Sequence, residues 1–271
     1  MDDIIIPNIK GGLGNQMFQI AAAKGLAVKH DAFSAINYNL SSGCKQGNEL
    51  SKYRFNFYSK IATTDDIPKL TYNEPHFHFS EIPFKGSSII DGYFQSIKYF
   101  KHCEEVVKNL FKFTSQDMLG WRQLKDKSAD SICNPLVVHI RRGDYKLYPT
   151  IHPVQTEEYY HDSLTYFLSK EKPPSCIIIC SDDWDSLYRD NLIGKVFTNK
   201  NIPVYVTKGC SELQDLYIMS QCSNIIMSNS SFSWWGEFLG VQKDTVAPKA
   251  WFGKDGPPDY YDIYNPSWKL I

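Results

Sequence analysis

Residues 135–145 read Pro-Leu-Val-Val-His-Ile-Arg-Arg-Gly-Asp-Tyr, and this stretch decides the fold class. Its apolar first half is typical of a strand that is buried on both faces of a parallel sheet. Two arginines and an aspartate follow at once, so polar residues begin where the strand ends. Ligands of open α/β sheets bind at this carboxyl end. The stretch therefore predicts a buried strand that leads into a binding loop.

An alternation of strands and helices surrounds this stretch and predicts an α/β fold with a parallel sheet covered on both faces. We expect strands near 135–141, 175–181, 203–206 and 223–228, and helices near 156–170, 184–191, 211–221 and 231–240. In the N-terminal half we expect strands at 4–6 and 88–94, a tight glycine-rich loop at 11–14, helices at 15–30 and 97–113, and loops with short elements at 38–86.

The length of 271 residues favours two modest domains, since single domains usually have about 100–200 residues. The polar segment 115–134 indicates a boundary near residue 130. We expect an N-terminal domain at 1–130, a C-terminal domain at 131–250, and a tail at 251–271 that packs back on the first domain.

Composition excludes several classes of protein. A net charge of −1 without long blocks of like charge argues against nucleic acid as a partner. Seven cysteines without a CxxC pair indicate mostly buried, reduced thiols rather than a disulfide framework or a zinc site. The acidic start and the short apolar run at 4–6 predict neither a secretion signal nor a transmembrane segment. We expect a cytoplasmic protein, and peripheral association with the membrane stays open.

The glycine-rich loop at 11–14 is a candidate anion site. Glycines let a diphosphate approach the backbone, and the helix that follows offers unpaired amides, so Gly12, Gly14 and Asn15 are candidate ligands. A tight strand-to-helix turn explains the same residues, because the loop lacks both the Walker lysine and the GxGxxG spacing.

The two adjacent arginines need anionic partners. In a strand His139 and Arg141 share one face and Arg142 points to the other. We therefore expect Arg141 to contact a ligand phosphate and Arg142 to pair with a structural carboxylate, for which Asp144 is the candidate. Surface salt bridges around a buried histidine are the alternative.

Carboxylates follow the next strand at Asp182, Asp183 and Asp185. Asp183-Trp184-Asp185 matches the DxD pattern that binds a divalent metal in some nucleotide-sugar enzymes. Helix capping by these carboxylates explains the pattern equally.

The last candidate region extends from Asp215 to Gly236. One carboxylate can accept both the N1–H and the 2-amino group of guanine, and Asp215 is the candidate for this role. The serine hydroxyls and helix-start amides of residues 228–231 can bind phosphate, with Ser230 and Ser231 as the candidates. Helix capping by these residues, with Trp234 and Trp235 as core packing, is the alternative.

Taken together, these stretches resemble the bacterial α-1,2-fucosyltransferases. The shared motifs are GGLGNQMFQ at 11–19, HIRRGDY at 139–145 and SNSSFSWW at 228–235, with GYFQS at 92–96, KYF at 98–100, SDD at 181–183 and the pair Tyr159-Tyr160 also similar. The resemblance covers residues 5 to about 240. The HxRRxD core is also similar to that of α-1,6- and protein O-fucosyltransferases.

The resemblance implies a GT-B fold of two Rossmann-like domains facing a cleft, with the first domain on the acceptor side. It implies transfer of L-fucose from GDP-β-L-fucose, without a metal, to a galactose-containing glycan, such as one of the cell surface. It also implies these contacts to the donor: Arg141 on the diphosphate, His139 and Asp215 on guanine, Gly12, Gly14 and Asn15 near the diphosphate and fucose, Ser230 and Ser231 in the phosphate pocket, and Asp182 and Asp183 shaping the nucleotide site rather than binding metal.

The general base is not fixed by the resemblance. Related α-1,6 enzymes place a carboxylate a few residues after their HxRRxD aspartate, whereas residues 145–149 contain no acid. Asp144, His152 and Glu157 are the candidates. Two rival functions stay open, which are a metal-dependent GT-A transferase built on Asp183 and Asp185 and a sugar- or nucleotide-binding protein without turnover.

Overall fold

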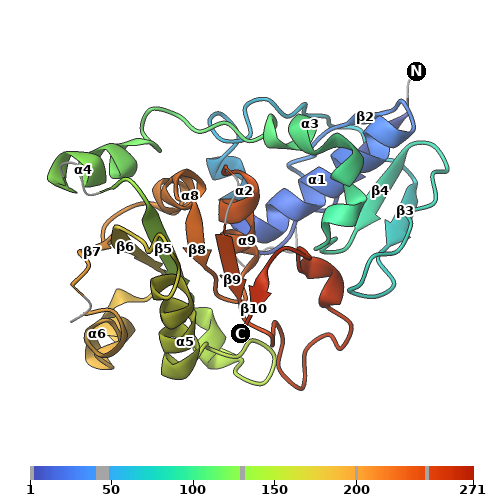
Figure 1. The fold of residues 1–271 in the computed structure, drawn as a ribbon. Coiled ribbons are helices and arrows are strands. Elements are labelled where there is room, and N and C mark those ends of the chain that lie inside the picture. Colours follow the sequence, from blue (N-terminus) through green and yellow to red (C-terminus); the bar gives the residue numbers. More distant parts are fainter. Residues whose placement is uncertain (1–2, 41–48, 129–131, 199–200, 242–243) are drawn as a thin grey trace. The chain divides into compact units, whose positions relative to one another are not determined.

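The structure is a computed structural model that describes residues 3–40, 49–128, 132–198, 201–241 and 244–271 (Figure 1). The chain forms two compact units. Unit 1 comprises residues 1–114 and 259–265, and unit 2 comprises residues 115–258 and 266–271. The expected boundary at residue 130 lies outside the described residues, so the predicted domain limits stay a prediction.

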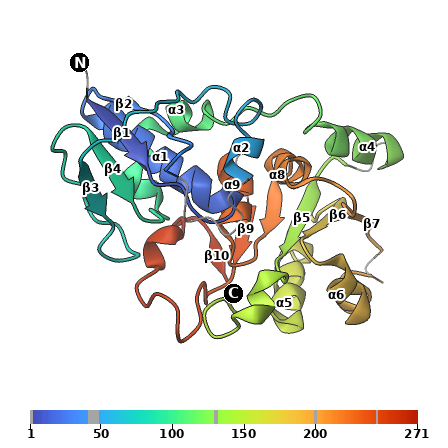
Figure 2. The same ribbon diagram turned by 180° about the vertical axis from the view of Figure 1, so that it is seen from behind.

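Unit 1 is built on a parallel four-stranded sheet in the order β2-β1-β4-β3. Its elements are β1 (Ile4–Pro7), α1 (Leu13–Lys29), β2 (Phe33–Ser34), α2 (Glu49–Lys52), β3 (Leu70–Asn73), β4 (Ser88–Asp91), η1 (Ile97–Tyr99), η2 (Lys101–Cys103), α3 (Glu104–Lys108) and η5 (Tyr261–Ile263). Helix α1 lies along the sheet (Figure 2) and buries most of its length, as the apolar run after the glycine loop predicts.

Residues 259–265 are joined to unit 1 by polar contacts of Asp262. Its carboxylate accepts a hydrogen bond from Phe79 N at 2.8 Å and pairs with Lys98 Nζ. These contacts and the position of η5 show that the chain returns to unit 1 before its last strand, which lies in unit 2.

Unit 2 is built on a parallel six-stranded sheet in the order β10-β9-β8-β5-β6-β7. Its elements are α4 (Leu119–Ser128), β5 (Pro135–Ile140), η4 (Asp144–Leu147), α5 (Glu157–Leu168), β6 (Cys176–Ser181), α6 (Trp184–Arg189), α7 (Leu192–Val196), β7 (Val204–Val206), α8 (Glu212–Gln221), β8 (Asn224–Ile226), α9 (Ser231–Phe238), β9 (Asp244–Ala247) and β10 (Lys269–Leu270).

Helices cover both faces of the unit 2 sheet, as the βαβ rhythm predicts. Figure 1 shows α5 and α6 on one side and α4 and α8 on the other. Alternate residues of β5, including Leu136 and Val138, join Tyr160 and Phe167 of α5 in one buried cluster. Every residue of β5 and β6 is buried, because both faces of each strand are covered.

The strand order reverses direction beside β5. From β5 the chain proceeds outward through β6 and β7, and it then returns to place β8, β9 and β10 on the other side. Such a switch point leaves a crevice at the carboxyl ends of the two central strands, here β5 and β8. In unit 1 the corresponding point lies between β1 and β4.

Some sequence predictions of elements were wrong. The expected helix at 97–113 is two 3₁₀ turns and the short helix α3. The carbonyl of Tyr99 lies so close to Gly25 of α1 that any Cβ there would collide with it, so tight packing onto α1 outweighs local helix propensity. The elements α4, β9 and β10 were not predicted, whereas the short elements α2 and β3 agree with the loops and short elements expected at 38–86.

Two further expectations concern buried residues. Trp234 and Trp235 are 2% and 0% exposed, which confirms them as core residues. The described cysteines are free thiols, and four of these six are buried, whereas Cys44 lies outside the described residues. Across the described ranges, no helix has the length and apolar character needed to cross a bilayer.

Candidate functional site

Arg141 follows β5 directly and lies at the switch point of unit 2. Its backbone N–H donates to Ser228 Oγ at 2.9 Å, and Ser228 follows β8 closely. Ser228 Oγ in turn donates to the carbonyl of His139 at 3.0 Å. Two central strands are thus tied together where ligands of parallel sheets bind.

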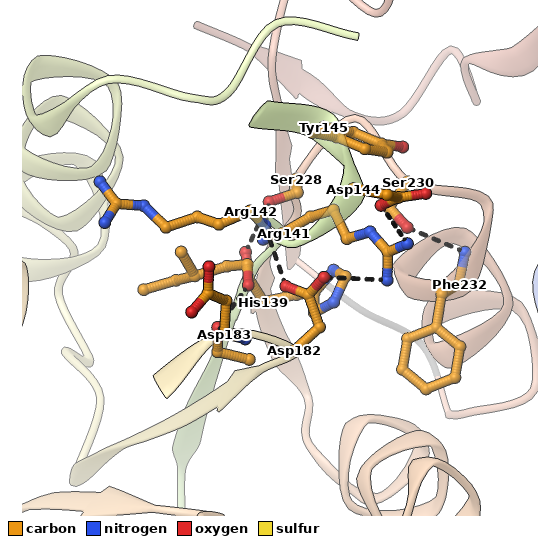
Figure 3. A network of polar contacts seen from close by, with 12 residues as sticks. His139, Arg141, Arg142, Asp144, Tyr145, Asp182, Asp183, Ser228, Ser230 and Phe232 are labelled. Carbon is orange, nitrogen blue, oxygen red and sulfur yellow. Dashed lines mark hydrogen bonds and ion pairs between the residues drawn. The ribbon is translucent and has the colours of Figure 1, made fainter. Parts of the chain in front are cut away.

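The Arg141 guanidinium lies between two carboxylates (Figure 3). Its Nη2 pairs with Asp144 Oδ1 at 2.6 Å and its Nη1 pairs with Asp182 Oδ2 at 3.1 Å. Burial opposes the charge of the guanidinium, but Asp182 and Asp144 outweigh burial and raise its pKa. The side chain stays 29% exposed. The result is a fixed cation whose planar donors can also reach an anionic ligand.

Arg142 points away from Arg141, as alternation along a strand predicts. Its Nη1 donates to Ser186 Oγ at 2.7 Å and pairs with Asp190 Oδ2 at 2.6 Å. The expectation of a structural carboxylate for Arg142 holds, but the choice of Asp144 was wrong. Asp144 begins a 3₁₀ turn three residues after Arg141, which brings its carboxylate to Arg141 instead.

Asp182 organises the loop after β5. Its Oδ1 accepts a hydrogen bond from Arg142 N at 2.9 Å, while Oδ2 pairs with Arg141. A Cβ at Gly143 would collide with Asp182 Oδ2, so a larger residue there would displace this carboxylate. Asp182 therefore supports the arginine loop directly.

Asp183 of the DxD pattern already has two structural partners. Its Oδ1 accepts a hydrogen bond from Ser186 N at 3.1 Å as the N-cap of α6, and its Oδ2 pairs with Lys146 Nζ. The Lys146 contact, together with the cap, lowers the pKa of Asp183. Asp185 lies in the first turn of α6. The helix-capping interpretation thus accounts for Asp183.

Ser228 and Tyr145 both lie at the arginine loop. Ser228 belongs to the serine run that the sequence interpretation considered for phosphate binding, whereas Tyr145 was not proposed for any role. Ser228 is fully buried and also bonds Tyr160 Oη at 3.0 Å. Tyr145 Oη donates to the Asn229 carbonyl at 2.8 Å, and its ring lies 5.3 Å from the Arg141 guanidinium. The signal was the serine-rich run directly after a buried strand, where a hydroxyl can bond two neighbouring strands.

Ser230 and Ser231, the two candidates of this run, lie at the start of α9. Ser230 is its N-cap, with Oγ accepting from Phe232 N at 3.3 Å (Figure 3), and Ser231 is the first helical residue. Capping, the alternative function for Ser230, is therefore present. The amides of this helix start lie on the same chain segment as Ser228, which contacts Arg141.

His139 and Asp215 are both buried titratable groups. His139 is 3% exposed, and burial together with Arg141 lowers its pKa to about 3, so the ring is neutral. Asp215 is 9% exposed, its Oδ1 has no hydrogen-bond partner, and burial raises its pKa to about 7 despite the nearby Thr207 and Cys180. Cys180 is the strand partner of His139 and also contacts Asp215, so His139 and Asp215 lie near each other.

Asp215 does not cap its helix. Ser211 is the N-cap of α8 and forms a capping box with Gln214, so the capping interpretation of Asp215 was wrong. A buried carboxyl with an unsatisfied oxygen is costly in a folded protein. Such a group is a functional-site candidate.

The three candidate bases have different surroundings. His152 stacks on Tyr145 with ring centroids 4.8 Å apart, and burial lowers its pKa, although Asp144 partly opposes this. Asp144 pairs with Arg141. Glu157 instead pairs with Lys195 at 3.1 Å on the first turn of α5, and no contact joins it to the arginine loop in the described part of unit 2.

The glycine-rich candidates lie in unit 1 at the start of α1. Gly12 is the N-cap residue of α1, and Gly14 is buried within the helix. Gly11 has a φ of +79°, and a Cβ there would lie 2.7 Å from Asn15 Nδ2. Asn15 Oδ1 accepts a hydrogen bond from Gln95 Nε2 at 2.7 Å. The amide of Asn15 is thus held over the glycine loop.

Within the described ranges of both units, no group of three or more histidine, cysteine, aspartate or glutamate side chains is arranged to hold a metal ion.

Comparison with known proteins identifies the fold and the family. Fucosyltransferase NodZ from Bradyrhizobium superposes with a TM-score of 0.58 at 16% identity, covering 89% of this chain and 94% of that one. NodZ, an α-1,6-fucosyltransferase, has also been crystallised and soaked with GDP-fucose. The fold of this chain is therefore that of the GT-B glycosyltransferases, as the resemblance implied. The model of glycosyl transferase family 11 matches residues 8–271, and the chain belongs to that family.

Two curated relatives carry more specific names. The α-1,2-colitosyltransferase of Escherichia coli is 28% identical over 284 residues, which span 93% of each chain. The galactoside 2-α-L-fucosyltransferase of Caenorhabditis elegans is 24% identical over 203 residues, which span 68% of this chain and 52% of that protein. The chain is thus a glycosyltransferase, and the expectation of an enzyme is confirmed.

Proposed function

We propose that this enzyme transfers L-fucose from GDP-β-L-fucose to the 2-hydroxyl of a terminal galactose on a glycan, with inversion and without a metal ion. The observation that carries the proposal is the family match over residues 8–271, combined with a strand-end arginine held between two carboxylates. The names of the two relatives support α-1,2 transfer.

Arg141 is the proposed group that stabilises the leaving GDP. As the bond between fucose C1 and the β-phosphate oxygen breaks, negative charge grows on the diphosphate. A pre-positioned guanidinium stabilises that charge without reorganising. The raised pKa of Arg141 keeps this guanidinium protonated throughout the reaction. We infer that Ser230, Ser231 and the start of α9 add donors to the same phosphates.

We infer that guanine binds beside His139 and Asp215. An ionised Asp215 would accept two hydrogen bonds from the N1–H and 2-amino groups of guanine, which adenine cannot supply. This role would satisfy the unpartnered Oδ1 of the buried carboxyl. Asp182 and Asp183 would act on the nucleotide site by holding the loop at Arg141 and the start of α6.

The acceptor hydroxyl loses its proton as it attacks fucose C1, and His152 and Asp144 are the proposed bases. His152 is suited to this task because its lowered pKa leaves the ring unprotonated at neutral pH. Asp144 is the alternative because it contacts Arg141 and therefore lies near the reacting atoms. Replacing each in turn, His152→Gln and Asp144→Asn, assigns the proton acceptor through the loss of kcat and the change in its pH profile.

In unit 1, Gly12, Gly14 and Asn15 are proposed to contact the diphosphate and fucose. A neutral amide that is fixed by Gln95 suits the hydroxyls and ring of a sugar. We propose that the enzyme works on the cytoplasmic side, with peripheral membrane association where the acceptor is lipid-linked.

The test is to incubate the protein with GDP-fucose and a galactose-terminated oligosaccharide. Release of GDP in step with a new α-1,2-fucosylated product is expected, with linkage assigned by NMR. Binding without GDP release would indicate a binding protein. Turnover of a colitosyl or mannosyl donor in preference to GDP-fucose would reassign the donor.

The same assay in the presence of EDTA tests whether transfer requires a metal ion. We expect transfer to persist in EDTA, because the arginine supplies the positive charge. Complete loss of transfer that Mn²⁺ restores would contradict the proposal and favour a metal centre at Asp183 and Asp185.

A further inference from the structure

The switch point of unit 1 carries a polar cluster at the carboxyl ends of β1 and β4. Asp91 ends β4, and its two carboxylate oxygens take different partners from the chain just after β1. Oδ1 pairs with Lys10 Nζ at 2.6 Å, and Oδ2 accepts from Asn8 Nδ2 at 3.0 Å. Burial acts to raise the pKa of Asp91. The contacts with Lys10 and Asn8 outweigh burial and lower the pKa, so the carboxyl is ionised.

An exposed aromatic ring lies beside this cluster. The ring of Tyr93 is centred 5.2 Å from Lys10 Nζ, and the residue is 40% exposed. Lys10 and Asp91 keep 31% and 27% of their side-chain surface exposed. A hydrogen-bonding carboxylate, an amide and an ammonium next to an aromatic face are the groups that recognise sugar hydroxyls and sugar C–H surfaces.

The cluster is held rigidly from both strands. Gln19 of α1 is 1% exposed and bonds both backbone groups of Lys10, accepting from its N–H at 2.9 Å and donating to its carbonyl at 3.2 Å. On the other side, Glu74 Oε2 accepts from Tyr93 N at 2.7 Å, and a Cβ at Gly92 would collide with Glu74. Buried supports of this kind fix a binding constellation before ligand arrives.

We propose that Asn8, Lys10, Asp91 and Tyr93 form a subsite for an uncharged pyranose ring. Opposite charges on Lys10 and Asp91 balance, so the cluster favours neither an anion nor a cation. Its place at the strand switch point is where open α/β sheets bind ligands. The inference rests on the proposed sugar transfer, and the ring it binds belongs either to the acceptor glycan or to the donor fucose.

The test compares Tyr93→Ala, Tyr93→Phe and Asp91→Asn with the parent enzyme. We expect Tyr93→Ala and Asp91→Asn to raise the KM of one sugar substrate about tenfold, corresponding to roughly 1.4 kcal/mol, because each removes one contact. Tyr93→Phe keeps the aromatic face and should retain most of the affinity. Phe55→Ala, which removes an 87% exposed ring elsewhere in unit 1, is the matched control.

Two readouts distinguish the source of the sugar. A raised KM for the galactoside acceptor, with unchanged hydrolysis of GDP-fucose in its absence, assigns the subsite to the acceptor. A raised KM for GDP-fucose hydrolysis assigns it to the donor. Unchanged values in both assays for both variants would overturn the subsite, provided that their thermal midpoints match the parent.

A direct binding measurement separates this inference from the proposed function. Calorimetric titration with a galactose-terminated disaccharide, with and without GDP, needs no turnover. If the parent enzyme does not transfer fucose, the proposed function fails while Tyr93-dependent binding still supports the subsite. If the parent transfers fucose and Tyr93→Ala binds and turns over normally, the subsite alone fails.

Discussion

The two units carry polar residues at the same topological position but differ in electrostatic character. In unit 2 the carboxyl ends of β5 and β8 surround Arg141, a cation held by two carboxylates. In unit 1 the carboxyl ends of β1 and β4 carry one balanced ion pair, Lys10–Asp91, and neutral amides. The arrangement in unit 2 supports the proposed diphosphate site, and the arrangement in unit 1 supports the proposed subsite for an uncharged sugar.

The supports of the two sites differ in the same way. Arg141 and Arg142 are held by charged partners from the arginine loop itself, from the loop after β6 and from the C-cap of α6. Lys10 and Asn15 are held by Gln19 and Gln95, which are almost fully buried. Because charged contacts hold the unit 2 site, we expect substitutions there to have large, salt-dependent effects on activity. Substitutions in unit 1 should have smaller effects.

Substitution of Arg141 should have the largest effect. Arg141→Ala removes the cation proposed to stabilise the leaving group, and we expect a loss in kcat of roughly 10³-fold. Arg141→Lys should recover only part of it, because an ammonium lacks the planar donors. Turnover within tenfold of the parent would remove Arg141 from the mechanism, and the thermal midpoint serves as the control for folding.

Substitution of Asp215 should have the second-largest effect, which is on the affinity for GDP and which should depend on pH. If the carboxylate accepts hydrogen bonds from guanine, GDP binding must displace its proton. With a pKa of about 7, the affinity for GDP should weaken by about tenfold per pH unit below 7. Asp215→Asn should bind GDP at least tenfold more weakly at pH 8 and lose this part of the pH dependence. Calorimetry in buffers of different ionisation enthalpy measures the released proton.

The stability of the ligand-free protein gives an independent check on Asp215. Its folded-state pKa lies above the ordinary value of 3.8, so its contribution to stability is fully present below pH 4 and is lost as pH rises through about 7. Asp215→Asn should therefore be more stable than the parent at pH 8. An equal or lower denaturation midpoint at pH 8 would contradict a raised pKa.

Substitutions of Gln95 and Asn15 in unit 1 should lower kcat by a smaller factor, and their effects should be coupled. Gln95→Glu replaces the amide donor with an acceptor, which would reverse the amide of Asn15. We expect a loss of about tenfold in kcat, and about the same loss in Asn15→Ala and in the double variant, because Gln95 acts through Asn15. Losses that multiply in the double variant would show that Gln95 acts independently.

The sequence predicted the central strands of unit 2 and their strand-end loops, because fully buried parallel strands such as β5 and β6 leave a strong apolar signal. It missed the shorter strands β9 and β10. It also separated Arg141 from Arg142 by strand alternation. It could not identify Asp190 as the partner of Arg142, since that contact spans 48 residues of chain. The broken helix after β4 was missed because its cause, the close approach of Tyr99 to Gly25, is tertiary.

Substitution at the contact between Arg142 and Asp190 should have the smallest effect on catalysis. It therefore gives the clearest contrast with substitution of Arg141. Arg142 is mostly buried at 13% side-chain exposure, whereas Asp190 is 51% exposed. Asp190→Asn keeps the shape of the contact and removes its charge, so we expect a stability loss of about 1 kcal/mol or less. Turnover per folded molecule should stay within a factor of about two, since Ser186 still holds the guanidinium. A large fall in kcat with unchanged denaturant midpoint would show that Arg142, too, acts on the substrate.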